Sequence, residues 1–176
     1  MNSHDEALIE ASIHYSITQD GDLARISTPY KMRCSTKMGV GFDFFDCGYM
    51  KFRHRVKKGS PQFSIRTHRM VFYLHHGHLP EFIDHIDRDT RNNKISNLRE
   101  ATRAQNNSNK ESLKGSTSKY LGVYKGTRKK GRWEAQISNN YKKIFLGRFK
   151  TEVEAAIAYN KAAIKHHGDF ANLNEI

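Results

Sequence analysis

The sequence has 176 residues, and its 30 lysines and arginines against 18 aspartates and glutamates give a formal net charge of +12 at pH 7. That length suits one ordinary domain or two small ones, and the 10 Phe, 8 Tyr and 1 Trp exclude a disordered chain. The longest apolar run, Met70–Leu74, is too short to span a membrane, and the N-terminus has no signal-peptide pattern. We therefore expect a cytoplasmic protein whose partner is a polyanion, with nucleic acid as the first candidate.

The two cysteines exclude two further classes of protein, those with a four-thiolate zinc site and those built on a disulfide scaffold. Cys34 and Cys47 form no CxxC pair, so neither a four-thiolate zinc site nor a disulfide scaffold is expected. Two reduced thiols are the default in the cytosol.

Short strands are predicted over the first third of the chain. The clearest is Tyr49–Val56, where alternation gives one apolar face and one basic face. The basic face carries Lys51, Arg53 and Arg55. Further strands are expected at Ile13–Thr18, Leu23–Ile26 and Phe63–Thr67, followed by a short helix over His68–His76.

Residues 84–106 hold the densest polar chemistry of the chain. A calcium loop starting at Asp87 fails, because Asn92 and Leu98 stand where such a loop needs Gly and Glu. A zinc site built from neighbouring histidines has poor helical spacing and no nearby cysteine, so we expect no structural zinc. Those histidines are His75, His76, His78 and His85.

Metal-assisted cleavage of a phosphodiester fits the same segment better. This chemistry needs a base to activate water and a divalent ion to stabilise charge at the phosphate. Histidine titrates near neutral pH, and a carboxylate with an amide oxygen suits magnesium. On a strand Ile83–Ile86, Asp84 and His85 point to opposite faces unless the strand ends there. A helix capped by Thr102 would bring Asn106 back over the strand pair.

Asp84-His85, Asn97 and Asn106 resemble the motif of HNH nucleases of the ββα-metal type, in the branch found in phage and intron-encoded homing endonucleases. The resemblance implies that His85 is the general base and that Asp84 and Asn106 hold one divalent ion, Mg²⁺ or alternatively Mn²⁺. It implies that Asn97 braces the two strands through hydrogen bonds to the loop backbone. The products would carry 5′-phosphate and 3′-hydroxyl ends. A His68-Arg69 pair also matches the family, and we expect His68 to pack at a helix start.

The tail has the signals of a small sheet with one helix. Strands are expected at Tyr120–Tyr124, Arg132–Ser138 and Lys143–Phe149, and a helix at Thr151–His167. Thr151 and Glu154 form a capping box, and Gly168 sits where a C-terminal cap belongs. Val153, Ala156, Ile157, Ala163 and Ile164 can form one face of this helix.

Basic residues are concentrated on this tail. Twelve lysines and arginines lie between Lys110 and Lys150, opposed only by Glu111 and Glu134. A β-sheet can enter the major groove and place alternate side chains on base edges. Trp133, Ala135 and Ile137 are expected to face the helix. The candidate DNA contacts are Tyr124, Lys125, Arg128, Lys130, Arg132, Glu134, Gln136, Ser138 and Lys143, together with Lys51, Arg53 and Arg55.

Residues 118–174 resemble the APETALA-type (ethylene-response-factor) DNA-binding domain. Its pattern is matched by Gly122-Val123, Gly131-Arg132-Trp133, Leu146-Gly147, Phe149, Glu154-Ala155-Ala156, Ala158-Tyr159 and Asn172. The resemblance implies a three-stranded antiparallel sheet on one helix, with the sheet in the major groove. The contact residues differ: Leu121, Tyr124 and Ser138 stand where Arg is usual, and Gln136 where Glu is usual. The groove docking therefore carries over, but the plant target sequence does not.

Together these features predict an α+β chain with a nuclease domain at 1–109, its ββα-metal motif at about 81–109, a linker at 110–118 and a DNA-binding domain at 119–176. The predicted function is a metal-dependent, site-directed endonuclease acting on double-stranded DNA, as a monomer or a dimer, without a membrane or small-molecule partner. A non-cleaving DNA-binding regulator with a vestigial nuclease half is the main alternative. An RNA-associated basic protein is a third.

Overall fold

The computed structural model describes residues 3–18, 23–25, 44–54, 59, 62–109, 116–126 and 132–176. Its helices and small antiparallel sheets confirm the predicted α+β class. The chain divides into two compact units, Met1–Glu100 and Ala101–Ile176. The domain boundaries expected from the sequence stay a prediction, since residues 110–115 lie outside the described part. No helix in the described ranges is both long enough and apolar enough to cross a membrane.

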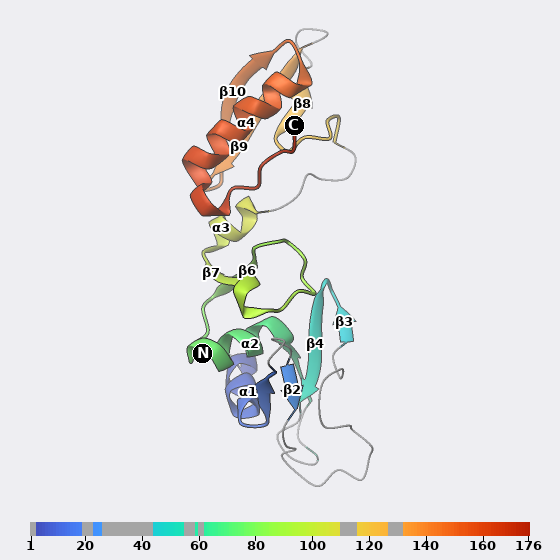
Figure 1. Cartoon of the computed structure of the whole chain (residues 1–176), viewed down its shortest axis with the longest axis vertical. Helices are drawn as coiled ribbons and strands as arrows, with labels where there is room; N and C mark the ends of the chain where they lie inside the picture. The colour runs from blue at the N-terminus through green and yellow to red at the C-terminus, as the bar shows by residue number, and fades with distance from the viewer. Residues whose placement is uncertain are drawn as a thin grey trace. The chain divides into compact units, whose positions relative to one another are not determined.

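In its described residues, the first unit combines two helices with small antiparallel sheets. Its helices are α1 (Ser3–Ser12) and α2 (Thr67–His76). Its strands are β1 (Tyr15–Ile17), β2 (Leu23–Arg25), β3 (Phe44–Asp46), β4 (Tyr49–His54), β5 (Phe63–Arg66), β6 (Phe82–His85) and β7 (Leu98–Ala101), with a 3-10 turn η1 (Ile95–Asn97) before β7. β1 pairs with β2, and β4 lies between β3 and β5. β6 pairs with β7, and Figure 1 shows these two strands side by side.

Helix α2 supplies the centre of the first core. Met70 and Val71 are fully buried in one cluster with Phe52 of β4 and Ile65 of β5. The helix ends at Gly77, which adopts the left-handed conformation and donates its N–H to the Tyr73 carbonyl, as a C-terminal glycine cap does. The predicted helix over His68–His76 is confirmed.

Helix α1 was not expected, because its sequence is acidic and has no long apolar stretch. Leu8 and Ala11 are nevertheless buried, and α1 contacts both α2 and β5. Strand β1 begins at Tyr15, so the strand predicted from Ile13 starts too early. Arg55 of the predicted basic face lies outside the described residues.

The second unit is a three-stranded sheet covered by one long helix. It contains α3 (Arg103–Ser108), β8 (Val123–Lys125), β9 (Trp133–Asn139), β10 (Lys142–Phe149), α4 (Glu152–His167) and a 3-10 turn η2 (Gly168–Phe170). The strands follow the antiparallel order β10-β9-β8, and α4 lies along one face of the sheet (Figure 1). β8 starts at Val123 rather than Tyr120, because the chain turns at Gly122 with φ 71°.

The predicted caps of α4 are confirmed. Thr151 and Glu154 form the reciprocal capping box, and the Gly168 N–H is donated to the Ile164 carbonyl. Of the residues that can form one apolar face, Ala156 and Ala163 are buried, whereas Val153, Ile157 and Ile164 are 41%, 40% and 59% exposed. The face that meets the sheet consists of Ala155, Ala156, Tyr159, Ala162 and Ala163. Small side chains let the helix approach the sheet closely, and this selects against the larger apolar residues.

Candidate functional site

The end of strand β6 carries Asp84 and His85, both of them buried. The backbone continues directly into the loop after β6. There the Ile86 N–H donates a hydrogen bond of 2.9 Å to the carbonyl of Asn97, the last residue of η1. The two side chains have different partners, as alternation along a strand requires. Asp84 contacts Arg99 on β7, and His85 contacts Asn93 in the loop and rings from α2 and β4.

The His85 imidazole is held in a fixed orientation. Its Nε2 lies 3.1 Å from Asn93 Oδ1, and its ring centroid lies 5.1 Å from that of His68 and 6.2 Å from that of Tyr49. The contact with Asn93 and the two neighbouring rings together hold the plane of the His85 imidazole.

His68 lies at the start of α2, as the sequence predicted, and it packs against the candidate base. Its side chain is buried, and its Nδ1 has no hydrogen-bond partner among the residues the structure describes. Burial, aided by the nearby His85, Arg66 and Arg69, lowers the pKa of His68 to about 3. The ring is therefore neutral at physiological pH.

Asn97 connects the loop after β6 to the start of β7. Its Nδ2 donates to Asp87 Oδ1 and to the Asn92 carbonyl, each at 2.8 Å, while its Oδ1 accepts the Asp87 N–H at 3.0 Å. Partial burial raises the pKa of Asp87, but the hydrogen bonds from Asn92, Asn97 and the Asp89 amide outweigh it, so the net shift is downward. These bonds lie where the family resemblance places a structural brace.

The two predicted metal ligands have the donor types that a magnesium-class ion prefers. Asp84 Oδ2, however, accepts hydrogen bonds from Arg99 Nε at 2.8 Å and pairs with Arg99 Nη2 at 2.7 Å. Asn106 lies on α3, which begins with a capping box between Thr102 and Gln105 and belongs to the second unit. Within the described ranges, no group of three or more His, Cys, Asp or Glu side chains is arranged to hold a metal ion. The ligand pair therefore stays a prediction.

Several residues near this site were not predicted. Tyr49 and Asn93 contact His85, and Arg99 contacts Asp84. Arg69, the partner of His68 in the family pattern, has a structural role: it pairs with Asp5 of α1 at 2.8 Å and donates to the Pro80 carbonyl at 3.1 Å. Arg69 thus links α1 and α2 to the entry of β6.

The outer face of the second sheet carries most of the described candidate DNA contacts. Ala135 and Ile137 are buried towards α4 and Trp133 packs on the same core, which agrees with the predicted alternation along β9. Across the strands, Tyr124 and Arg148 both stand opposite Glu134. The Arg148 Nε donates to Glu134 Oε1 at 2.8 Å.

Further along this face, the strands pair Gln136 with Phe145 and Ser138 with Lys143. Phe145 is half exposed, and Arg148 lies over its ring at 5.5 Å. Arg132, Lys125 and Lys143 are exposed. Arg128 and Lys130 lie outside the described residues.

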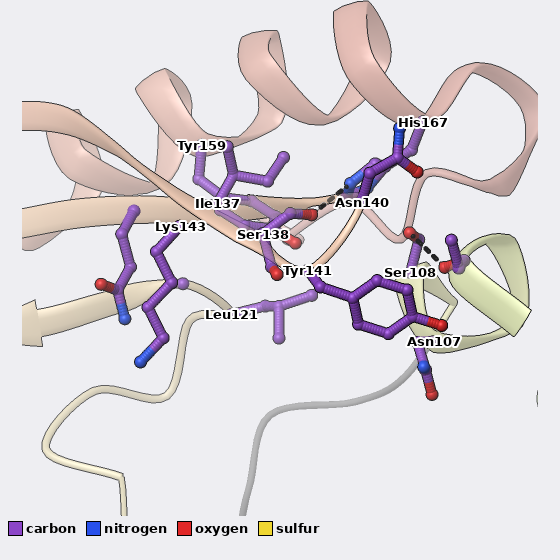
Figure 2. A pocket seen from close by; sticks show the side chains of 13 residues that line it. Asn107, Ser108, Leu121, Ile137, Ser138, Asn140, Tyr141, Lys143, Tyr159 and His167 are labelled. Atoms are coloured by element: carbon purple, nitrogen blue, oxygen red, sulfur yellow. Dashed lines mark hydrogen bonds between the residues drawn. The ribbon is translucent and has the colours of Figure 1, made fainter.

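A cavity of about 400 Å³ opens in the second unit beside this face. Figure 2 shows Tyr141 of the β9–β10 turn beside Ser108 of α3, with Lys143, Ser138 and Leu121 along the wall. Three predicted DNA contacts, Gln136, Ser138 and Lys143, line it. The outer sheet face is thus hollowed at the positions expected to face DNA.

On the first unit, β4 and β5 form a second basic surface. Lys51 of β4 stands directly opposite Arg66 of β5, and Arg53 is exposed opposite Ser64. Two cations facing each other across a strand pair destabilise the sheet. A polyanion on this face would relieve that repulsion.

Comparisons with known proteins agree with both resemblances. Residues 66–108 match the HNH endonuclease family. The chain is 35% identical over 117 residues to an uncharacterised HNH endonuclease of Acanthamoeba polyphaga mimivirus, which covers 64% of this chain and 58% of that protein.

Plant proteins match a shorter stretch of the chain. An APETALA2-like protein 2 of Oryza sativa is 48% identical over 60 residues, 33% of this chain and 13% of its own length. A dehydration-responsive element-binding protein 2D of Arabidopsis thaliana is 45% identical over 56 residues, 30% of this chain and 27% of its own length. Residues 66–108 thus match the HNH endonuclease family, and about a third of the chain is similar to plant proteins such as APETALA2-like protein 2.

Proposed function

We propose that this protein is a metal-dependent, site-directed DNA endonuclease of the homing type, in which the HNH domain cuts and the C-terminal sheet holds the DNA. The observation that supports the nuclease activity best is the state of His85. It is buried, lies within hydrogen-bonding distance of Asn93 and packs against the rings of His68 and Tyr49, within the segment that matches the HNH family. A general base needs such a fixed orientation.

The proposed mechanism assigns one task to each residue. His85 accepts a proton at Nδ1 from the water that attacks the scissile phosphate, while Nε2 stays bonded to Asn93. Asn97 holds the loop that carries Asp87 and Asn92. A magnesium-class ion held by Asp84 and Asn106 would stabilise the charge that develops on the phosphate.

The tail is proposed to place its sheet in the major groove. Gln136 is able to read adenine through its amide, and Lys143, Arg132 and Lys125 would hold phosphates or guanine. Tyr124 and Ser138 on the same sheet would also contact the DNA. Glu134 is paired with Arg148, so its role would be to position that arginine. Lys51 and Arg53 on β4 would add contacts near the nuclease domain.

A nicking assay on supercoiled plasmid tests this proposal. Wild type is expected to nick in Mg²⁺ and not in EDTA, leaving 5′-phosphate and 3′-hydroxyl ends. Asp84→Asn should abolish nicking, and His75→Asn, an exposed position on α2, serves as the matched control and should nick normally. A wild-type protein that binds DNA without cutting in Mg²⁺ or Mn²⁺ would contradict the proposal.

The non-cleaving regulator is the second candidate, and one observation favours it. The carboxylate expected to bind the ion is paired with Arg99. The same assay separates the two functions, since a regulator binds duplex DNA and never nicks it. Competition between duplex DNA and structured RNA excludes or supports an RNA partner.

A further inference from the structure

We propose that Arg99 is a displaceable counter-ion of the metal site. It neutralises Asp84 while no metal is bound, and a divalent cation takes its place. The inference rests on the proposed function, because the ion site is part of that function.

The contact between Arg99 and Asp84 is close and directed at a single atom. Arg99 Nε and Nη2 lie 2.8 Å and 2.7 Å from the same oxygen, Asp84 Oδ2. The pair joins neighbouring strands, since β6 and β7 form one two-stranded sheet. Charge-assisted hydrogen bonds of this length are among the strongest in proteins.

Burial favours a cation beside the Asp84 carboxylate. Its side chain is 4% exposed, and an ionised carboxylate taken out of water is costly unless it is paired or coordinates a metal. A guanidinium and a divalent ion would repel each other at the same oxygen, and this repulsion is strong in a poorly solvated place. One cation therefore excludes the other.

The exposed fractions of the two side chains indicate which residue leaves the pair when the metal binds. Arg99 is 20% exposed against 4% for Asp84, so the arginine is the solvent-facing member of the pair. A cation arriving from solvent meets the guanidinium first. Displaced, Arg99 can extend into water, whereas the buried Asp84 has no such freedom.

A permanent brace would have the opposite effect on metal affinity. If Arg99 stayed in place and oriented Asp84 for the metal, removing the arginine would weaken metal binding. If Arg99 competes with the metal, removing it tightens binding. Whether removal of Arg99 tightens or weakens metal binding therefore distinguishes a competitor from a brace.

The test is calorimetric binding of Mn²⁺ to the full-length protein, without DNA. We expect Arg99→Gln to bind Mn²⁺ about tenfold more tightly than wild type. Asp84→Asn should lose this binding. Arg91→Gln removes the same charge from an exposed loop position and should leave the affinity unchanged. Unchanged or weaker binding by Arg99→Gln overturns the proposal.

Thermal unfolding gives a second readout. Arg99→Gln should melt below wild type in EDTA, because Asp84 is left without its counter-ion, and Mn²⁺ should raise its melting temperature by more than it raises that of wild type. Equal shifts in the two proteins overturn the proposal. Should Arg99→Gln not fold, Arg99→Lys takes its place in the test. Lysine makes a weaker, single-point contact with Asp84, so Mn²⁺ should bind this variant more tightly than wild type. An affinity for Mn²⁺ no higher than that of wild type overturns the proposal.

A failure of this exchange can be distinguished from a failure of the proposed function. If wild type cuts DNA and binds Mn²⁺ through Asp84, but Arg99→Gln gains no affinity, the exchange alone is wrong. If wild type shows no Mn²⁺ binding that depends on Asp84, the proposed ion site and the exchange are both wrong.

Discussion

The imidazole of His68 meets that of His85 edge to face, with 5.1 Å between the ring centroids and 74° between the ring planes. His68 starts α2 and His85 ends β6, so this contact joins the best-packed helix of the first unit to the candidate base. Tyr49 closes the group, with its ring 5.1 Å from that of His68. The position of the base therefore depends on residues distant in sequence.

Removing the His68 ring should impair the chemical step more than DNA binding. We expect His68→Ala to lower the cleavage rate about 100-fold, because a misplacement of about 1 Å at a reacting group has an effect of that size. KM should stay near its wild-type value. His68→Phe, which keeps an aromatic ring, should recover much of the rate, and His75→Ala is the control on the exposed side of α2. A wild-type rate in His68→Ala would show that the contact has no role in positioning.

The depressed pKa of His68 also makes folding stability depend on pH. In the folded protein this pKa is about 3, whereas an unfolded histidine has a pKa near 6.5. Below pH 6.5 the unfolded chain takes up a proton that the folded chain refuses, so stability falls as pH falls towards 3. The expected loss from this group is about 2 kcal/mol between pH 8 and pH 5.

Urea unfolding at the two pH values measures this loss. His68→Phe should lose about 2 kcal/mol less than wild type, and any constant effect of the larger ring cancels because each protein is compared with itself. Identical losses in the two proteins would mean that His68 titrates normally.

Asn97→Ala should destabilise the first unit by about 3 kcal/mol, since three hydrogen bonds made by a buried side chain are lost at about 1 kcal/mol each. Asn97→Asp should not rescue it, because the new carboxylate would face that of Asp87. Asn107→Ala, at an exposed position, should change stability by less than about 0.5 kcal/mol. Urea unfolding gives all three values, and a wild-type midpoint for Asn97→Ala would remove its role as a brace.

Gly122 should tolerate no side chain. A Cβ at this position would collide with the Tyr159 ring and the Gln136 carbonyl, and its φ of 71° already disfavours other residues. Gly77 has a similar φ of 73° but open space around it, so it isolates the backbone effect. We expect Gly77→Ala to lower the free energy of unfolding by about 1 kcal/mol and Gly122→Ala to lower it by about 3 kcal/mol or more, as urea unfolding would measure. Equal costs would show that the turn, and not the approach of Tyr159, requires glycine.

Local signals in the sequence were sufficient for several elements. The capping box of Thr151 and Glu154 and the alternation of Ala135 and Ile137 depend on neighbours along the chain, and both are present. Helix α1 depends instead on tertiary contacts, such as the pairing of Asp5 with Arg69. Its acidic sequence gives no local sign of them.

Side-chain size and strand register explain the remaining differences between the predicted and the observed structure. Hydrophobicity alone places Ile164 of α4 inside, but the close approach to the sheet favours Ala162 and Ala163. The pairing of Arg99 with Asp84 requires the register of β6 against β7, which the sequence does not contain. The residues of the nuclease motif could be named from the sequence, but their contacts with Tyr49, His68 and Arg99 could not.

DNA affinity should depend steeply on salt. If about 6–10 phosphates are contacted, a plot of log K against log salt concentration should have a slope of about −5 to −9. Lys143→Gln should reduce the magnitude of the slope by about 1, whereas Lys161→Gln, on the exposed side of α4, should leave it unchanged. Titrations of a labelled duplex at several NaCl concentrations measure this. A slope near zero would contradict the basic sheet as a DNA-binding surface.

In the proposed mechanism His85 performs the chemistry while other residues hold the DNA. The decisive measurement is the single-turnover cleavage rate and the Kd of wild type and His85→Ala on one labelled duplex in Mg²⁺. We expect the rate to fall about 10³-fold and the Kd to stay unchanged. A His85→Ala protein that cuts at the wild-type rate, or that loses DNA binding in parallel with cleavage, would contradict this mechanism.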